Sequence, residues 1–163
     1  MTIDEINALD RLAFVDALGG VFEHSPWVAE RAWDRRPFAS ASELHDVMVD
    51  EVAHASRAEQ LDLLRAHPDL GTRARMSAAS SGEQAGAGLD RLPPALYERL
   101  LRLNGTYRSR FGFPFILAVR GATTDEVLSA IARRVDASPE DERTEALAQV
   151  ARIARNRLND IVQ

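Results

Sequence analysis

The chain has 163 residues, 45% of them hydrophobic, which favours one domain with a single buried core. It contains no cysteine, and all of its 20 basic residues are arginine. These absences exclude disulfides, thiolate catalysis, lysine Schiff bases and a lysine-bound pyridoxal cofactor. The formal net charge of -5 argues against a dedicated nucleic-acid-binding protein, whose affinity usually rests on a basic surface.

The first helix is predicted over residues 6–18, and it should end at Gly19-Gly20 because glycine commonly follows the last helical turn. Ser25 is then a suitable N-cap for the next helix, with Pro26 as its first residue. The N-terminus is acidic where a signal peptide would be basic, and no apolar run is long enough to span a bilayer. We therefore expect a soluble cytoplasmic protein that does not enter membranes.

Helical spacing of apolar residues continues through the middle of the chain. Ser42 is expected to begin one helix, and another should lead directly into His67. The pair Pro93-Pro94 predicts the start of a long helix that ends near residues 111–112.

Residues 113–121 are too apolar and too few for a surface helix, so we expect a buried extended segment there. Thr123 and Glu126 have the spacing of a capping box and predict a helix to about residue 135. A last helix should begin at Ser138-Pro139 and continue to the C-terminus. The predicted fold is an all-α, single-domain bundle of about eight helices, spanning residues 1–163, with one short buried extended segment.

The stretch from Leu64 to Leu89 concentrates the candidate chemistry. His67 precedes a proline, which pushes it out of the helical region and should hold its imidazole at a sharp turn. An arginine-bearing connector follows, and Ser80 with Glu83 has the spacing of a second capping box. We expect these two helix ends to place an acid/base, a carboxylate, an amide and a hydroxyl around one small cavity.

Each of these residues also has a simpler interpretation. His67 is compatible with a helix terminus that favours a cation, and Ser80 with Glu83 is compatible with an ordinary cap. Arg157 lies on a helix whose other arginines look solvated, but if that helix packs across the bundle, its guanidinium reaches the cavity and holds a carboxylate. The remaining histidines lack metal-ligand spacing, so no metal site is predicted.

Several weak motifs follow one another in a fixed order. They are His67-Pro68-Asp69-Leu70, Ser80-x-x-Glu83-Gln84, Leu103-Asn104-x-x-Tyr107 and Arg110-Phe111-Gly112-Phe113-Pro114-Phe115-Ile116. Phe22-Glu23-x-Ser25-Pro26-Trp27 precedes them, and Arg157-Leu158 follows them. Together they resemble the 2-oxo-4-hydroxy-4-carboxy-5-ureidoimidazoline (OHCU) decarboxylase family over nearly the whole chain.

The resemblance implies an all-α homodimer that uses neither cofactor nor metal and completes the breakdown of urate to (S)-allantoin. It implies that His67 is the catalytic acid/base, that Glu83 is the second essential group and that Arg157 binds the substrate anion. The substrate contacts that it implies are Pro68, Ser80, Gln84, Phe115, Ile116, Leu117, Ala118 and Val119. Members often carry Arg-Leu-x-Asn where this chain has residues 134–137, a difference that we interpret as a variation at a helix end.

Three other interpretations stay open at this stage. The first is a related helical enzyme acting on another ureido or imidazoline acid, or one half of a fused pathway protein that works separately. The second is a helical small-ligand-binding or interaction module without turnover, for which a broken polar set would be expected. The third is a transcriptional regulator, which the negative charge and the lack of a convincing recognition helix disfavour.

Overall fold

The computed structural model describes residues 1–71 and 77–163, and the arginine-bearing connector expected after His67 falls largely on residues 72–76, outside the described residues. The described residues form helices and irregular segments without a strand, which confirms the predicted all-α class. They divide into two compact units. The first unit comprises Met1–Ala66 with Ala151–Gln163, and the second comprises His67–Val150.

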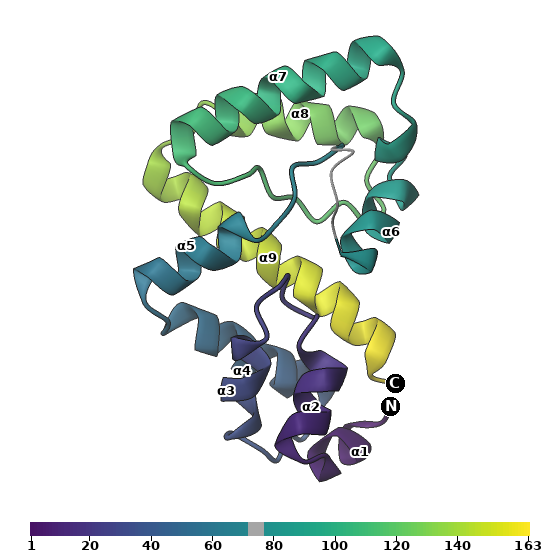
Figure 1. Cartoon of the computed structure of the whole chain (residues 1–163), viewed down its shortest axis with the longest axis vertical. Coiled ribbons are helices and arrows are strands. Elements are labelled where there is room, and N and C mark those ends of the chain that lie inside the picture. Colours follow the sequence, from purple (N-terminus) through teal and green to yellow (C-terminus); the bar gives the residue numbers. More distant parts are fainter. Residues whose placement is uncertain (72–76) are drawn as a thin grey trace. The chain divides into compact units, whose positions relative to one another are not determined.

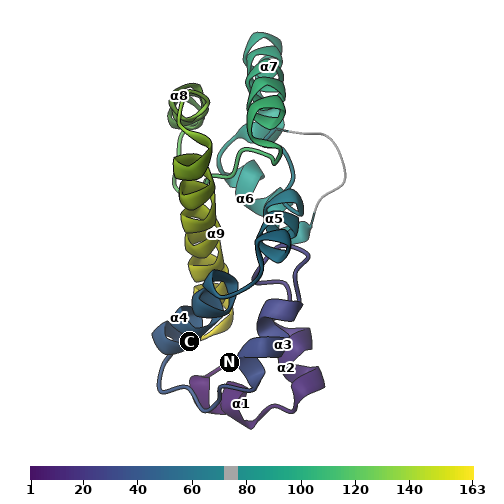
Figure 2. The same cartoon turned by 90° about the vertical axis from the view of Figure 1, so that its left-hand side faces the viewer.

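The first unit contains five complete helices and the end of a sixth. These are α1 (Ile3–Ala8), α2 (Arg11–Leu18), α3 (Trp27–Trp33), α4 (Ala41–Ala53), α5 (Arg57–Arg65) and the last turns of α9 (Pro139–Ile161). Helix α3 packs against both α2 and α4 (Figure 1). The chain ends lie side by side (Figure 2), because the Met1 amino group donates to the Ile161 carbonyl and the Gln163 amide donates to the Met1 carbonyl, both at 2.8 Å.

The second unit contains α6 (Ala78–Gly86), the short 3-10 helix η1 (Leu89–Arg91), α7 (Pro94–Phe111), α8 (Thr124–Arg134) and the first part of α9. Helix α7 packs against α8, and η1 packs against α6. Buried apolar side chains come from η1, α7, α8, the first part of α9 and the segment between α7 and α8. They include Leu89, Leu100, Tyr107, Phe113, Phe115, Ile116, Val127 and Ile131.

The prolines and caps that bound α7, α8 and the start of α9 act as predicted. Helix α7 begins at Pro94 and ends before Gly112, which takes the left-handed conformation at φ 78° and donates to the Arg108 carbonyl. The Thr123 hydroxyl accepts from the Glu126 amide at 3.2 Å and so caps α8. Helix α9 begins at Pro139, one residue after Ser138. These helix starts and stops depend on neighbours within four residues, so the sequence alone specifies them.

Several predicted helix starts are wrong. The single helix predicted over residues 6–18 is two helices, because the Asp10 carboxylate accepts from the Ala13 amide and caps a new helix. The Ser25 hydroxyl donates to the Glu23 carbonyl and caps nothing. The N-cap of α4 is Ser40, whose hydroxyl accepts from the Glu43 amide, and Ser42 lies inside the helix.

The segment between α7 and α8 is buried at Phe113, Phe115, Ile116 and Val119, as the sequence predicts. It has no regular secondary structure between residues 114 and 119. Its burial is therefore confirmed, while a fully extended backbone stays a prediction.

Candidate functional site

His67 lies just beyond the end of α5, at the first residue of the second unit. The helix ends at Arg65 with Ala66 as its C-cap, because the ring of Pro68 disfavours a helical conformation for the residue before it. The side chain of His67 is buried, with 6% of the residue exposed. A buried imidazole on a sharp turn is a suitable acid/base for a ligand that enters from outside the core.

The turn after His67 is held at two consecutive residues. Gln84 Oε1 accepts from the Gly71 amide at 2.8 Å, and Asn104 Nδ2 donates to the Leu70 carbonyl at 2.8 Å. Gly71 has φ 72°, and a Cβ there would lie 2.5 Å from a methyl group of Leu100. The turn therefore requires glycine, and α6 and α7 both fix its position.

The cap of α6 corrects the prediction for Ser80. Ser77 is the N-cap, and its hydroxyl accepts from the Ser80 amide at 3.1 Å. Ser80 consequently lies in the first turn, and it is buried together with Gln84, which is four residues further along the same face. Glu83 is half-buried. With Ser77 in the capping role, the inward position of Ser80 is not explained by helix capping.

The segment predicted to bind substrate through its backbone is tied to neighbouring side chains. Arg134 Nη1 donates to the Ile116 carbonyl at 2.7 Å, and the Ala118 amide donates to Gln149 Oε1 at 3.0 Å. The Ala118 amide, one of the expected ligand donors, therefore already has a partner. Contacts of residues 115–119 with a substrate stay a prediction.

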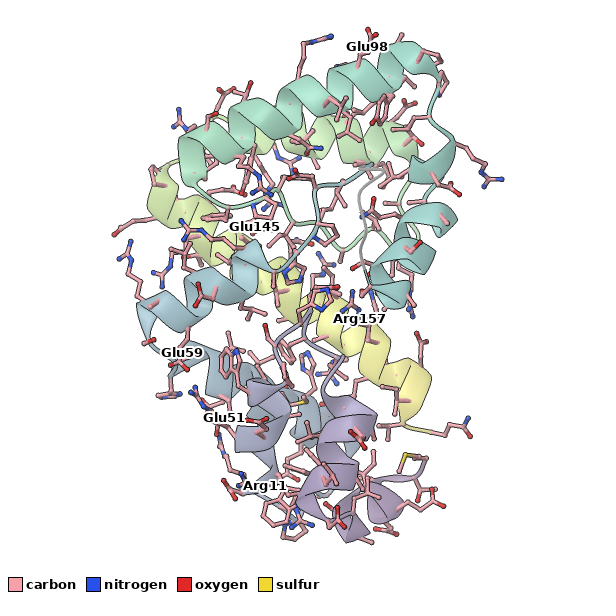
Figure 3. The ribbon with its side chains drawn as sticks, in the orientation of Figure 1. Arg11, Glu51, Glu59, Glu98, Glu145 and Arg157 are labelled. Atoms are coloured by element: carbon pink, nitrogen blue, oxygen red, sulfur yellow. The ribbon has the colours of Figure 1, made fainter. Side chains whose placement is uncertain are left out.

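Arg157 projects from the last part of α9 and lies in the first unit (Figure 3). Its Nη2 contacts Glu23 Oε2 at 2.8 Å, and its Nη1 donates to the Gly20 carbonyl at 3.3 Å. The Glu23 side chain is fully buried and that of Arg157 is 6% exposed. Arg157 is therefore not part of a solvated face, and the simpler interpretation of this residue is wrong.

Glu23 and Asn104 belong to motifs quoted above, but sequence reasoning gave neither of them a role. A signal for Glu23 existed, since an acidic residue directly after two apolar residues and before Ser-Pro-Trp needs a cation when it is buried. The signal for Asn104 was weaker, because an asparagine within a helix is usually exposed.

Among the predicted residues, the structure brings Gln84 to the turn that carries His67 and places Ser80 on the same buried face of α6. Arg157 belongs to the other unit, so a cavity shared by Arg157 and His67 stays a prediction. Within residues 1–71 and 77–163, no cluster of three or more histidine and acidic side chains is arranged to hold a metal ion. No helix in the same described ranges is both long and apolar enough to cross a membrane.

Comparisons with known proteins agree with one another. A family model described as OHCU decarboxylase matches residues 7–159. A 2-oxo-4-hydroxy-4-carboxy-5-ureidoimidazoline decarboxylase of Haloferax volcanii is 52% identical, covering 97% of this chain and 94% of that protein. A uric acid degradation bifunctional protein of Bacillus subtilis is 47% identical over 99% of this chain, which spans only 33% of that longer protein.

Solved structures give the same fold. A crystal structure of (S)-allantoin synthase matches 99% of this chain with a TM-score of 0.83 and 36% identity, and this chain covers 54% of that one. A crystal structure of OHCU decarboxylase in the presence of (S)-allantoin matches 86% of this chain with a TM-score of 0.72. At 23% identity, the second likeness supports the fold only.

Proposed function

We propose that this chain converts OHCU to (S)-allantoin and carbon dioxide. The premise is that the chain belongs to the OHCU decarboxylase family. The observation that carries this proposal is the buried His67 on a turn that Gln84 and Asn104 hold by hydrogen bonds. A decarboxylase of this kind needs one acid/base in a fixed position. The two units are proposed to act as one domain, which a single family model over residues 7–159 supports.

The chemistry needs no external electron sink. When the bond to the carboxylate breaks, its electron pair forms a double bond within the ring, and the pair of the adjacent C=N bond moves to nitrogen. That nitrogen takes up a proton, and the resulting enol gives allantoin when the carbon that bears the ureido group accepts a proton and the hydroxyl proton leaves. The protein must therefore orient the carboxylate, stabilise charge on nitrogen and deliver one proton to one face.

His67 is proposed to deliver that proton, because an imidazole gives and takes protons near neutral pH. Glu83 either orients the imidazole or binds the hydroxyl or ureido group of the substrate. Arg157 is proposed to bind the substrate anion. The proposed contacts with the rest of the substrate are Pro68, Ser80, Gln84, Phe115, Ile116, Leu117, Ala118 and Val119.

Three finer points belong to the same proposal. The electron flow above supports turnover without a metal or cofactor, and the family resemblance supports a homodimer. A substrate released by urate oxidation and hydrolysis favours a cytoplasmic enzyme without membrane or nucleic-acid partners.

The proposal is tested by generating OHCU from urate in situ and following circular dichroism. Spontaneous decay passes through an enol that is protonated on either face, so it yields racemic allantoin without a signal. We expect the protein to produce an (S)-allantoin signal, and His67→Asn to lower its rate by about 100-fold or more with the fold retained. The protein should not accelerate the disappearance of 5-hydroxyisourate itself, and allantoin as substrate should give no turnover. Binding of OHCU without faster (S)-allantoin formation would instead identify a ligand-binding module.

A further inference from the structure

A second buried arginine, Arg134, lies at the end of α8 with 5% of its surface exposed. All three nitrogens of its guanidinium are used by the protein. Nε donates to Glu142 Oε1 at 2.8 Å, Nη2 contacts the same oxygen, and Nη1 donates to the Ile116 carbonyl at 2.7 Å. Because desolvating an ion pair often offsets its attraction, such a pair is weak evidence for a purely stabilising role.

Two aromatic rings extend this arrangement. The Tyr107 hydroxyl donates to Glu142 Oε1, and burial followed by this bond raises the pKa of Tyr107 above its ordinary value. The Tyr107 ring meets Phe115 edge-on at 5.4 Å, while the Arg134 guanidinium lies 4.5 Å from the Phe115 ring centroid. Phe115 and Ile116 are therefore held through both their backbone and their side chains.

A second hydrogen bond holds the segment at Ala118, two residues after Ile116. Gln149 Oε1 accepts from the Ala118 amide at 3.0 Å, and Gln149 Nε2 donates to Glu145, labelled in Figure 3, at 2.8 Å. Bonds at both ends of its amide fix which atom of Gln149 faces the segment. In the extended conformation predicted for this segment, backbone groups of alternate residues face the same side, so the backbone groups of Leu117 would face away from the bonds at Ile116 and Ala118.

We propose that Arg134, held by Glu142, and Gln149 are positioning residues that anchor the 115–119 segment from one side so that its opposite edge can bind the urea-like part of the substrate. This inference rests on the proposed function, since that edge acts only if residues 115–119 contact OHCU. Arg134 is the residue of the 134–137 stretch that matches the family's Arg-Leu-x-Asn pattern, and it is bonded to the candidate site segment.

The test uses Arg134→Lys and Gln149→Met in the full chain, with exposed residues on the same helices as controls, Arg133→Lys and Arg152→Met. Lysine keeps the charge beside Glu142 but cannot bond the carboxylate and the Ile116 carbonyl through a planar fork. We expect each test variant to raise KM for OHCU by about tenfold with kcat changed less and the circular-dichroism fold unchanged. The controls should match the wild type. Gln149→Glu combined with Glu145→Gln, which keeps an acceptor for the Ala118 amide and a donor between the two side chains, should restore part of the loss.

Amide hydrogen exchange provides a readout that does not need activity. We expect exchange at residues 115–119 to accelerate in both test variants while the interior of α7 keeps its wild-type rate. Wild-type exchange in this segment together with a wild-type KM would overturn the inference. If the wild type itself does not turn over OHCU, the proposed function fails, and the exchange rates alone then decide whether Arg134 and Gln149 anchor the segment.

Should Arg134→Lys fail to fold, Gln149→Met carries the test, because it leaves the ion pair intact. An unchanged KM in a folded Gln149→Met protein overturns the role of Gln149. If the test variants and the control variants showed the same fall in kcat and the same rise in KM, a positioning role would likewise be contradicted.

Discussion

Two buried arginine–glutamate pairs, one in each unit, differ in the length of the hydrogen bond that each guanidinium donates to a backbone carbonyl. In the second unit, Arg134 gives Nε and Nη2 to Glu142 and Nη1 to the Ile116 carbonyl at 2.7 Å. In the first unit, Arg157 gives Nη2 to Glu23 at 2.8 Å, but its Nη1 reaches the Gly20 carbonyl only at 3.3 Å.

The bond lengths indicate how strongly each arginine is bound to the backbone. The bond from Arg157 Nη1 to the Gly20 carbonyl, at 3.3 Å, is longer than the bond from Arg134 Nη1 to the Ile116 carbonyl, at 2.7 Å, and a longer hydrogen bond is weaker. Arg134 bonds through Nε at 2.8 Å and through Nη1 at 2.7 Å, and it is suited to holding backbone. The roles proposed for the two arginines differ accordingly: Arg157 is proposed to bind the substrate anion, and Arg134 is proposed to position backbone.

The largest expected effect is on stability in the second unit. Glu142→Ala leaves the Arg134 charge buried without its partner and should lower the free energy of unfolding by about 3–5 kcal/mol in urea denaturation. The control is Glu140→Ala, an exposed residue in the first turn of the same helix. A loss no larger than that of the control would mean that the Arg134 pair contributes little.

The substitution Glu23→Gln tests the Arg157–Glu23 pair through its effect on catalytic activity. Glutamine keeps the shape but weakens the bond that orients Arg157, so we expect kcat/KM for OHCU to fall about thirtyfold, equivalent to about 2 kcal/mol. Glu30→Gln, at an exposed position on α3, is the matched control. Wild-type kcat/KM in Glu23→Gln would remove Glu23 from any positioning role.

Tyr107→Phe removes the hydrogen bond to Glu142 and should cost about 1.5 kcal/mol of unfolding free energy at neutral pH. The pKa of Tyr107 is raised in the folded state. Its contribution is therefore fully present below the ordinary tyrosine pKa of about 10 and is lost as the pH rises further, because the unfolded chain ionises first.

Urea denaturation between neutral and alkaline pH measures this dependence. We expect stability of the wild type to decline above pH of about 10 and the decline to be smaller in Tyr107→Phe. Tyr97→Phe changes the other tyrosine and should leave the decline as in the wild type. Identical alkaline profiles for wild type and Tyr107→Phe would contradict the assignment.

The smallest expected effect is that of Arg157→Lys. A lysine keeps the positive charge beside Glu23 but lacks the planar fork, so KM for OHCU should rise about fivefold while the melting temperature changes little. Arg152→Lys, exposed on the same helix, is the control in the same steady-state assay. An unchanged KM would count against Arg157 as the anion-binding residue.

The sequence by itself determined the all-α class and the helix boundaries that depend on near neighbours. Pro93-Pro94, the Thr123 cap and Gly112 act within one helical turn, so their effect is readable without a fold. The sequence does not identify which of two closely spaced serines caps a helix. Ser77 and Ser80 offer similar caps, and burial of Ser80 decides between them only in the folded chain.

The tertiary structure alone decided which charged and polar side chains meet. Arg157 and Glu23 are 134 residues apart, Tyr107 and Glu142 are 35 apart, and Gly71 and Gln84 are 13 apart. No helical period connects such residues, since local periodicity specifies a face of one element but not its partner. The sequence therefore indicated His67 and Arg157 as candidates, while the residues that hold them and their neighbouring segment in place emerged only from the packing of the chain.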